Sequence, residues 1–232
     1  MELKPGPGVF ALGPVSAGVS LRGESMSLNV LPAAASAAAI LIATSVTLLF
    51  PLGPLSAHML VHIALMNLAA PLLAIVLLRA WPAALDRASW LWTAAVVQLV
   101  LMWAWHAPPA HRAAVQSMPV SIVMYATLFS ASLAFWALLT SMSARNRWQA
   151  IFSLLITGKI ACLLGAILIF APRALYDMGH GHHGSASPAL DDQQLAGLIM
   201  VAACPLSFVL AGVIFAAQAM NDLDRNSTFL RS

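Results

Sequence analysis

The chain has 232 residues, of which 61% are apolar and only 8% are charged. Soluble globular domains carry about 25% charged residues, so this composition excludes a soluble globular protein and predicts an integral membrane protein. The net charge is only +3, and we expect no nucleic-acid partner. The two cysteines lie in apolar segments, and this position excludes an extracellular disulfide framework.

The first 30 residues are rich in Gly, Pro and Ser, which predicts a flexible tail. Six apolar segments follow, and each can supply the roughly 20 residues that a membrane span needs. No segment alternates as the strands of a barrel do. The predicted fold is therefore all-α, a six-helix transmembrane bundle over residues 31–220 with a C-terminal tail at 221–232. The predicted spans are Leu31–Phe50, Ala57–Leu78, Ala88–Trp105, Val120–Leu139, Ile151–Phe170 and Leu195–Gln218.

The positive charges predict the orientation of this bundle, because cytoplasmic loops carry an excess of Lys and Arg. If the N-terminus is cytoplasmic, only Arg112 and Arg173 lie on the outer side, and Lys159 lies within a span. Both termini are therefore predicted to be cytoplasmic. The inner side then holds Lys4, Arg22, Arg79, Arg87, Arg145, Arg147, Arg225 and Arg231.

The second span carries two histidines near its start, His58 and His62. Residues four apart share one face of a helix, with their Cβ atoms about 5–6 Å apart, and Met66 continues this face one turn deeper. Imidazole and thioether ligands suit copper, and an ionisable side chain inside a span indicates a functional site. The alternative is that both histidines only form hydrogen bonds with a neighbouring helix.

The third span ends with a second candidate pair, Met102 and His106, again four residues apart. Pro108 and Pro109 are predicted to stop this helix, and residues 110–117 to form a short interfacial helix. Met102 is either a metal ligand or a residue of the apolar core.

Lys159 lies midway along the fifth span. Either it extends toward the cytoplasm, or it pairs with the carbonyl of Asn67, which Pro71 cannot satisfy because proline has no N–H. Small residues beside Lys159 predict close approach of another helix; they are Gly158, Cys162 and Ala166.

The predicted orientation places all seven histidines on the outer side of the membrane. Three of them lie in a glycine-rich loop before the sixth span, which predicts a flexible metal-capture segment: His180, His182 and His183. Asp191 and Asp192 are predicted to cap the start of the helix that follows.

Four motifs resemble, in order and spacing, the multi-span CtaG family of cytochrome c oxidase assembly factors. They are SAHMLVH at 56–62, APLLA at 70–74, WHAP at 105–108 and DDQQLAGLIM at 191–200. The resemblance implies a protein of the bacterial plasma (inner) membrane that helps deliver copper to a haem–copper oxidase and catalyses no reaction itself. Its partners would be the oxidase subunits, soluble extracytoplasmic copper carriers and the lipid bilayer.

The chain departs from the family pattern at two places. Family members often have a further histidine in the fourth span, where this chain has Met124 and Tyr125. After WHAP the usual residues resemble Leu-Tyr-Asp, and this chain has Ala110, His111 and Arg112 instead.

Our leading hypothesis is a Cu(I) site formed by His58, His62 and His106 with Met66 or Met102, loaded through the loop histidines. A membrane haem protein for electron transfer is the first alternative, with His62 and His106 as axial ligands. A metal permease is the second; it would need polar residues through several spans, and the predicted spans offer few, chiefly Lys159, Asn67 and Gln98.

Overall fold

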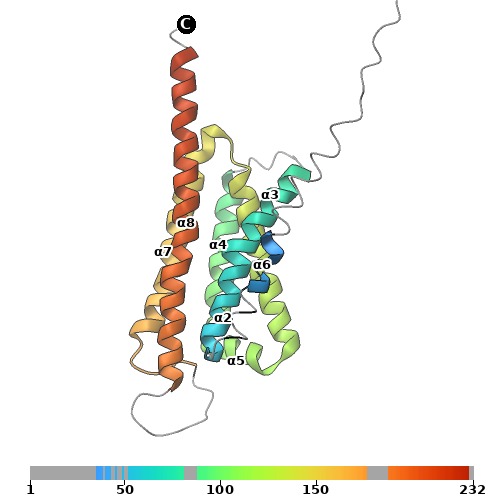
Figure 1. Cartoon of the computed structure of the whole chain (residues 1–232), viewed down its shortest axis with the longest axis vertical. Helices are drawn as coiled ribbons and strands as arrows, with labels where there is room; N and C mark the ends of the chain where they lie inside the picture. The colour runs from blue at the N-terminus through green and yellow to red at the C-terminus, as the bar shows by residue number, and fades with distance from the viewer. Residues whose placement is uncertain are drawn as a thin grey trace, which may run out of the picture.

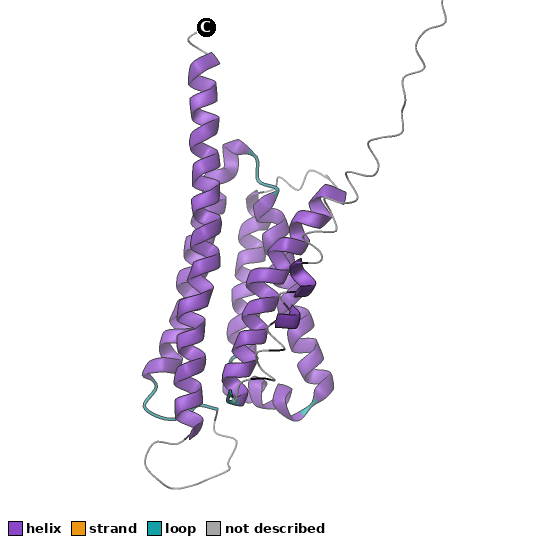
Figure 2. Cartoon of the chain, in the orientation of Figure 1, coloured by secondary structure: helices purple, strands orange, loops and turns teal. Residues whose placement is uncertain are grey.

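The computed structural model describes residues 35–38, 40–42, 45, 49, 52–80, 88–176 and 188–229. These residues are almost entirely helical, and no strand occurs among them (Figure 2). The prediction of an all-α protein is therefore confirmed. The elements are α2 (Pro54–Ile63), the π-helix η1 (Ala64–Ala69), α3 (Ala70–Ala80), α4 (Ala88–Trp105), α5 (Pro108–Gln116), α6 (Met118–Thr140), the 3-10 helix η2 (Ala144–Asn146), α7 (Arg147–Phe170) and α8 (Pro188–Phe229).

Several of these elements are long and apolar enough to cross a membrane. Four are single candidates, and α4 with α5 makes a fifth, bent by 73° between the two helices. The predicted span 31–50 falls largely outside the described residues, although those described within it are helical. Six spans and cytoplasmic termini therefore stay predictions. The four single candidates are Pro54–Arg79, Met118–Thr140, Ala144–Phe170 and Ala189–Asp222.

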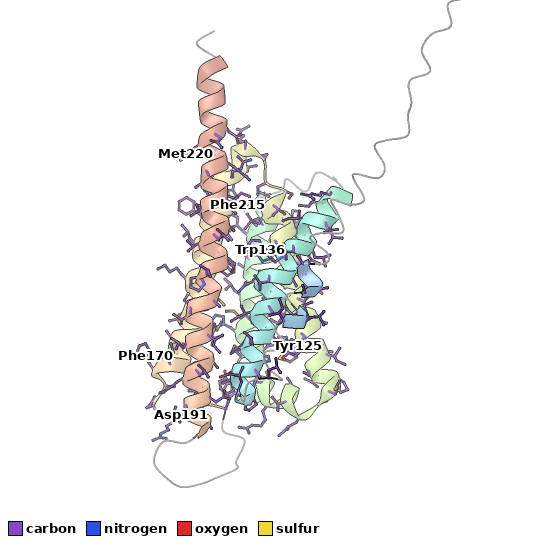
Figure 3. All side chains as sticks on the ribbon, viewed as in Figure 1. Tyr125, Trp136, Phe170, Asp191, Phe215 and Met220 are labelled. Atoms are coloured by element: carbon purple, nitrogen blue, oxygen red, sulfur yellow. The ribbon has the colours of Figure 1, made fainter. Side chains whose placement is uncertain are left out.

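The helices form two groups that run roughly along one axis (Figure 1). Helices α7 and α8 lie side by side over most of their length, and the rod α2–η1–α3 packs with α4 and α6 next to them. Tyr125 and Asp191 lie toward one end of the bundle and Met220 toward the other (Figure 3). Near that second end, an ion pair joins Arg147 of α7 to Asp222 of α8.

Prolines account for where several helices begin. Pro54, Pro108, Pro119 and Pro188 all lie in the first turn of a helix, where the missing N–H has no intrahelical partner to lose. The helices therefore start before the apolar segments from which the spans were predicted. The short helix after Trp105 is confirmed, beginning at Pro108.

The second span contains a π-turn that hydropathy did not predict. The N–H of Ala70 donates to the carbonyl of Leu65, five residues earlier. The next bond in this register would run from residue 71 to the carbonyl of Met66, but Pro71 has no N–H. In this register, the carbonyl that Pro71 leaves without its backbone donor is that of Met66, one residue before the carbonyl of Asn67 expected from α-helical spacing.

Helix α6 satisfies the freed carbonyl of Met66. The Ser132 hydroxyl donates to it at 2.8 Å and the Trp136 indole N–H at 3.0 Å. Both donors are buried, so the carbonyl needs no cation. Lys159 has an exposed side chain, which is consistent with extension along the bundle surface and not with pairing to this carbonyl.

A close contact between α7 and α8 involves two glycines. A Cβ added at Gly197 would lie 2.7 Å from the carbonyl oxygen of Gly165, and a Cβ added at Gly165 would lie 3.0 Å from that of Gly197. The small residues facing α8 are thus Gly158, Ala161 and Gly165, all buried. Of the predicted stripe, Gly158 lies in the contact with α8, where an added Cβ would lie 3.5 Å from Phe208, whereas Cys162 and Ala166 are only half-buried.

Candidate metal centre

Three histidines converge at one end of the bundle. His58 and His62 come from α2, and His106 follows the last residue of α4. One ring nitrogen from each lies within 4.8 Å of the other two. The ring centroids are 5.9 Å apart for His58 and His62, 5.7 Å for His58 and His106, and 5.2 Å for His62 and His106. Helical spacing predicted the first pair, whereas His106 is brought to it by the packing of α4.

Each of these three rings has one buried nitrogen with no hydrogen-bond partner among the described residues: His58 Nε2, His62 Nδ1 and His106 Nε2. Buried polar atoms are paired in the great majority of cases, so three unpaired nitrogens in one place indicate a ligand. A neutral imidazole offers one lone pair. The residues therefore fit a metal ion held by three imidazole nitrogens.

Hydrogen bonds at the opposite ring nitrogens prepare two of the histidines for this role. His106 Nδ1 lies 2.7 Å from the carbonyl oxygen of Met102. A carbonyl can only accept, so Nδ1 carries the proton and Nε2 the lone pair. His58 Nδ1 lies 2.8 Å from the hydroxyl of Tyr125 on α6, the helix in which the resemblance led us to expect a further histidine.

Asp192 fixes the start of the helix that carries His58 and His62. Its carboxylate accepts hydrogen bonds from the backbone N–H groups of Leu55 at 2.9 Å and Ser56 at 3.0 Å. The prediction that Asp192 caps its own helix was wrong. Because α8 begins at Pro188, Asp192 lies beyond the first N–H groups of α8 and faces the N-terminus of α2, while Asp191 remains exposed in the first turn.

Gln193 and Tyr176 hold the chain that follows α7 over the histidines. The fully buried Gln193 accepts a hydrogen bond from the N–H of Leu175 at 2.6 Å and donates to the carbonyl of Leu168 at 3.2 Å. Tyr176 then donates its hydroxyl proton to the carbonyl of His106. Burial raises the pKa of Tyr176 to about 12, so this phenol stays protonated at neutral pH.

A fourth imidazole, His111 of α5, lies beside the three. Its ring centroid is 5.0 Å from that of His58 and 4.9 Å from that of Tyr176. The side chain is buried, and its Nδ1 has no hydrogen-bond partner among the described residues. The sequence identifies His111 only as one of the seven outer histidines and as a departure from the family pattern, because nothing in the sequence indicates that α5 folds back onto α2.

The structure does not decide the role of the other predicted ligands. Met66 and Met102 are buried in the apolar core around the histidine end of the bundle, so both a packing role and a ligand role stay predictions. The loop histidines fall outside the described residues, and their metal-capture role also stays a prediction. They are His180, His182 and His183.

A family model supplies the remaining observation. The model of the cytochrome c oxidase caa3 assembly factors (Caa3_CtaG) matches residues 30–222. The chain belongs to this family. The match confirms the resemblance seen in the sequence motifs, and it covers all four histidines of the cluster. No curated protein and no solved structure gave a significant match. The chain is thus a member of a family of cytochrome c oxidase assembly factors, and it is an all-α protein with helices long and apolar enough to span a membrane.

Proposed function

We propose that this assembly factor binds Cu(I) at its histidine cluster and supplies it to a haem–copper oxidase, without catalysing a reaction. The observation that carries the proposal is the convergence of His58, His62 and His106, each of which offers a ring nitrogen within 4.8 Å of the other two. Each ring also has a buried nitrogen without a hydrogen-bond partner among the described residues. Copper is the cargo in this proposal. The protein binds it, shields it and releases it.

The chemistry of the donor set supports Cu(I) over a divalent ion. Among the described His, Cys, Asp and Glu side chains, the group that can share one ion contains only histidines. Neutral ligands leave the charge of the ion uncompensated, and moving charge into a buried site is costly. The cost rises with the square of the charge, so a monovalent ion suits this site better. Imidazole is also a suitable ligand for copper.

The same geometry disfavours a haem between His62 and His106. Axial imidazoles bind from opposite faces of the macrocycle, which places their ring centroids about 6 Å apart, whereas the ring centroids of His62 and His106 are only 5.2 Å apart. His58 also lies within 6 Å of both rings, at 5.9 and 5.7 Å. A porphyrin placed between the two rings would collide with it.

The charge distribution of the sequence supports a position for this site at the extracytoplasmic side of a bacterial plasma membrane. There it would exchange copper with soluble carriers and with oxidase subunits. The location of the cluster at the end of the bundle, beside the short helix α5, is consistent with such exchange.

The proposal is tested by titrating the full chain in detergent with Cu(I) against a chromophoric chelator. We expect about one tightly bound Cu(I) per chain and loss of this binding in His62→Ala. Leu55→Ala is the matched control, because it removes a similar buried side chain from the same helix but no ligand. Full copper retention after alanine replacement of all three histidines would refute the site. A Soret band in the purified protein would support haem instead.

A further inference from the structure

His111 lies next to the three-histidine group but is not part of it. It is on α5, which is bent 73° away from α4, and only 5% of its side chain is exposed. Its Nδ1 is buried without a hydrogen-bond partner among the described residues. Such an atom, next to a candidate metal site, indicates a ligand position that the three-histidine group does not account for.

The spacing of His111 and His58 is that of two rings sharing one ion. An imidazole nitrogen binds a first-row metal at about 2.0 Å, so the centroids of two coordinating rings lie about 5 Å apart at a tetrahedral N–metal–N angle and about 6 Å apart at a linear one. The three pairs of the inner group lie at 5.2 to 5.9 Å. The His58–His111 pair, at 5.0 Å, falls at the lower edge of this range.

His58 connects the two positions. Its Nδ1 is engaged by Tyr125, so Nε2 is the nitrogen available both to the inner group and to His111. Tyr176 also packs against the His111 ring, edge to face at 77°. The His111 ring therefore contacts both His58 and the chain that follows α7.

We propose that His111 and His58 form an outer Cu(I) position with two protein ligands at a bent angle, which leaves room for a ligand from a carrier and through which copper enters and leaves the three-histidine site. The proposal rests on the proposed copper-binding function. In the transfer, copper keeps its bond to His58, exchanges its bonds to His62 and His106 for one to His111, and remains Cu(I). No proton or electron moves, because all four imidazoles bind as neutral ligands.

The outer position lowers the barrier to release. Without it, three metal–nitrogen bonds must break before copper reaches a partner. With it, His111 forms a new bond as two others are lost, and a carrier then competes with only two ligands. His111 should therefore control the rate of copper transfer more than the affinity of the inner site.

The test compares His111→Leu with His111→Met. The two new side chains have similar volume, but leucine has no ligand atom whereas methionine has a thioether sulfur that can bind Cu(I). The full chain, loaded with Cu(I) in detergent, is mixed with a water-soluble Cu(I) chelator in a stopped-flow instrument. We expect His111→Leu to keep its copper stoichiometry and affinity but to transfer copper about tenfold more slowly or worse. His111→Met should recover most of the rate, and Arg112→Ala, an exposed neighbour, should match the parent.

Two results would overturn the outer position. Equal rates in the Leu and Met variants would show that His111 only packs. Loss of tight copper binding in His111→Leu, with unchanged thermal unfolding, would place His111 in the inner coordination sphere. If the parent chain binds no Cu(I), the proposed function itself fails, which this experiment distinguishes.

Discussion

Replacing Asp192 by alanine should loosen the start of α2 and, with it, the metal centre. The carboxylate accepts two backbone N–H bonds, at 2.9 and 3.0 Å. A hydrogen bond to a charged group contributes about 1.5–3 kcal/mol, but water can replace part of this at a half-buried site. Loss of a helix cap costs about 0.5–2 kcal/mol. Together these values predict that the free energy of unfolding falls by about 2–3 kcal/mol.

Gly53 provides an independent way to disturb the same contact. A Cβ added at Gly53 would lie 2.1 Å from the carboxylate carbon of Asp192, so Gly53→Ala must displace that side chain. Its effect should resemble that of Asp192→Ala. The double variant should be little less stable than either single variant, because both remove the same interaction.

Thermal unfolding in detergent and hydrogen exchange measure this effect. For a protein of this size, 2–3 kcal/mol corresponds to a decrease of about 5–10 °C in Tm, and the amides of Leu55 and Ser56 should exchange faster. Copper affinity should also fall, since α2 carries His58 and His62. Asp191→Ala, which changes an exposed neighbour, should behave as the parent. An unchanged Tm and unchanged exchange in Asp192→Ala would refute the capping interaction.

Three further predictions concern other parts of the chain. Gly197→Ala should lower the free energy of unfolding by about 1–3 kcal/mol through overpacking between α7 and α8, whereas Gly212→Ala, with nothing within 4 Å of the added Cβ, should not. A reporter fused after Arg147 should be cytoplasmic and one after Arg112 external; an external signal at Arg147 would contradict the topology. Serine at the three loop histidines should slow copper loading without changing the stoichiometry at saturation, and loss of tightly bound copper would contradict a capture role for His180, His182 and His183.

The sequence by itself predicted the all-α class, four of the long apolar helices to within a few residues, and the pairing of His58 with His62. These are local properties. The length of an apolar segment decides whether its helix can cross the hydrocarbon core of a bilayer. Helical spacing places residues four apart on one face. The resemblance, carried by short motifs, indicated the family that the match over residues 30–222 confirms.

Only the tertiary structure decided which distant residues meet. His106 reaches His62 across 44 positions, and His111 reaches His58 through the turn between α4 and α5. Asp192 caps a helix that begins 138 residues earlier, at Pro54. Helical periodicity predicts which face of a helix a residue occupies, but not which helix packs against that face or at what height. Those choices depend on close packing along the whole length of each pair, and they bring the unpaired nitrogens of this centre together.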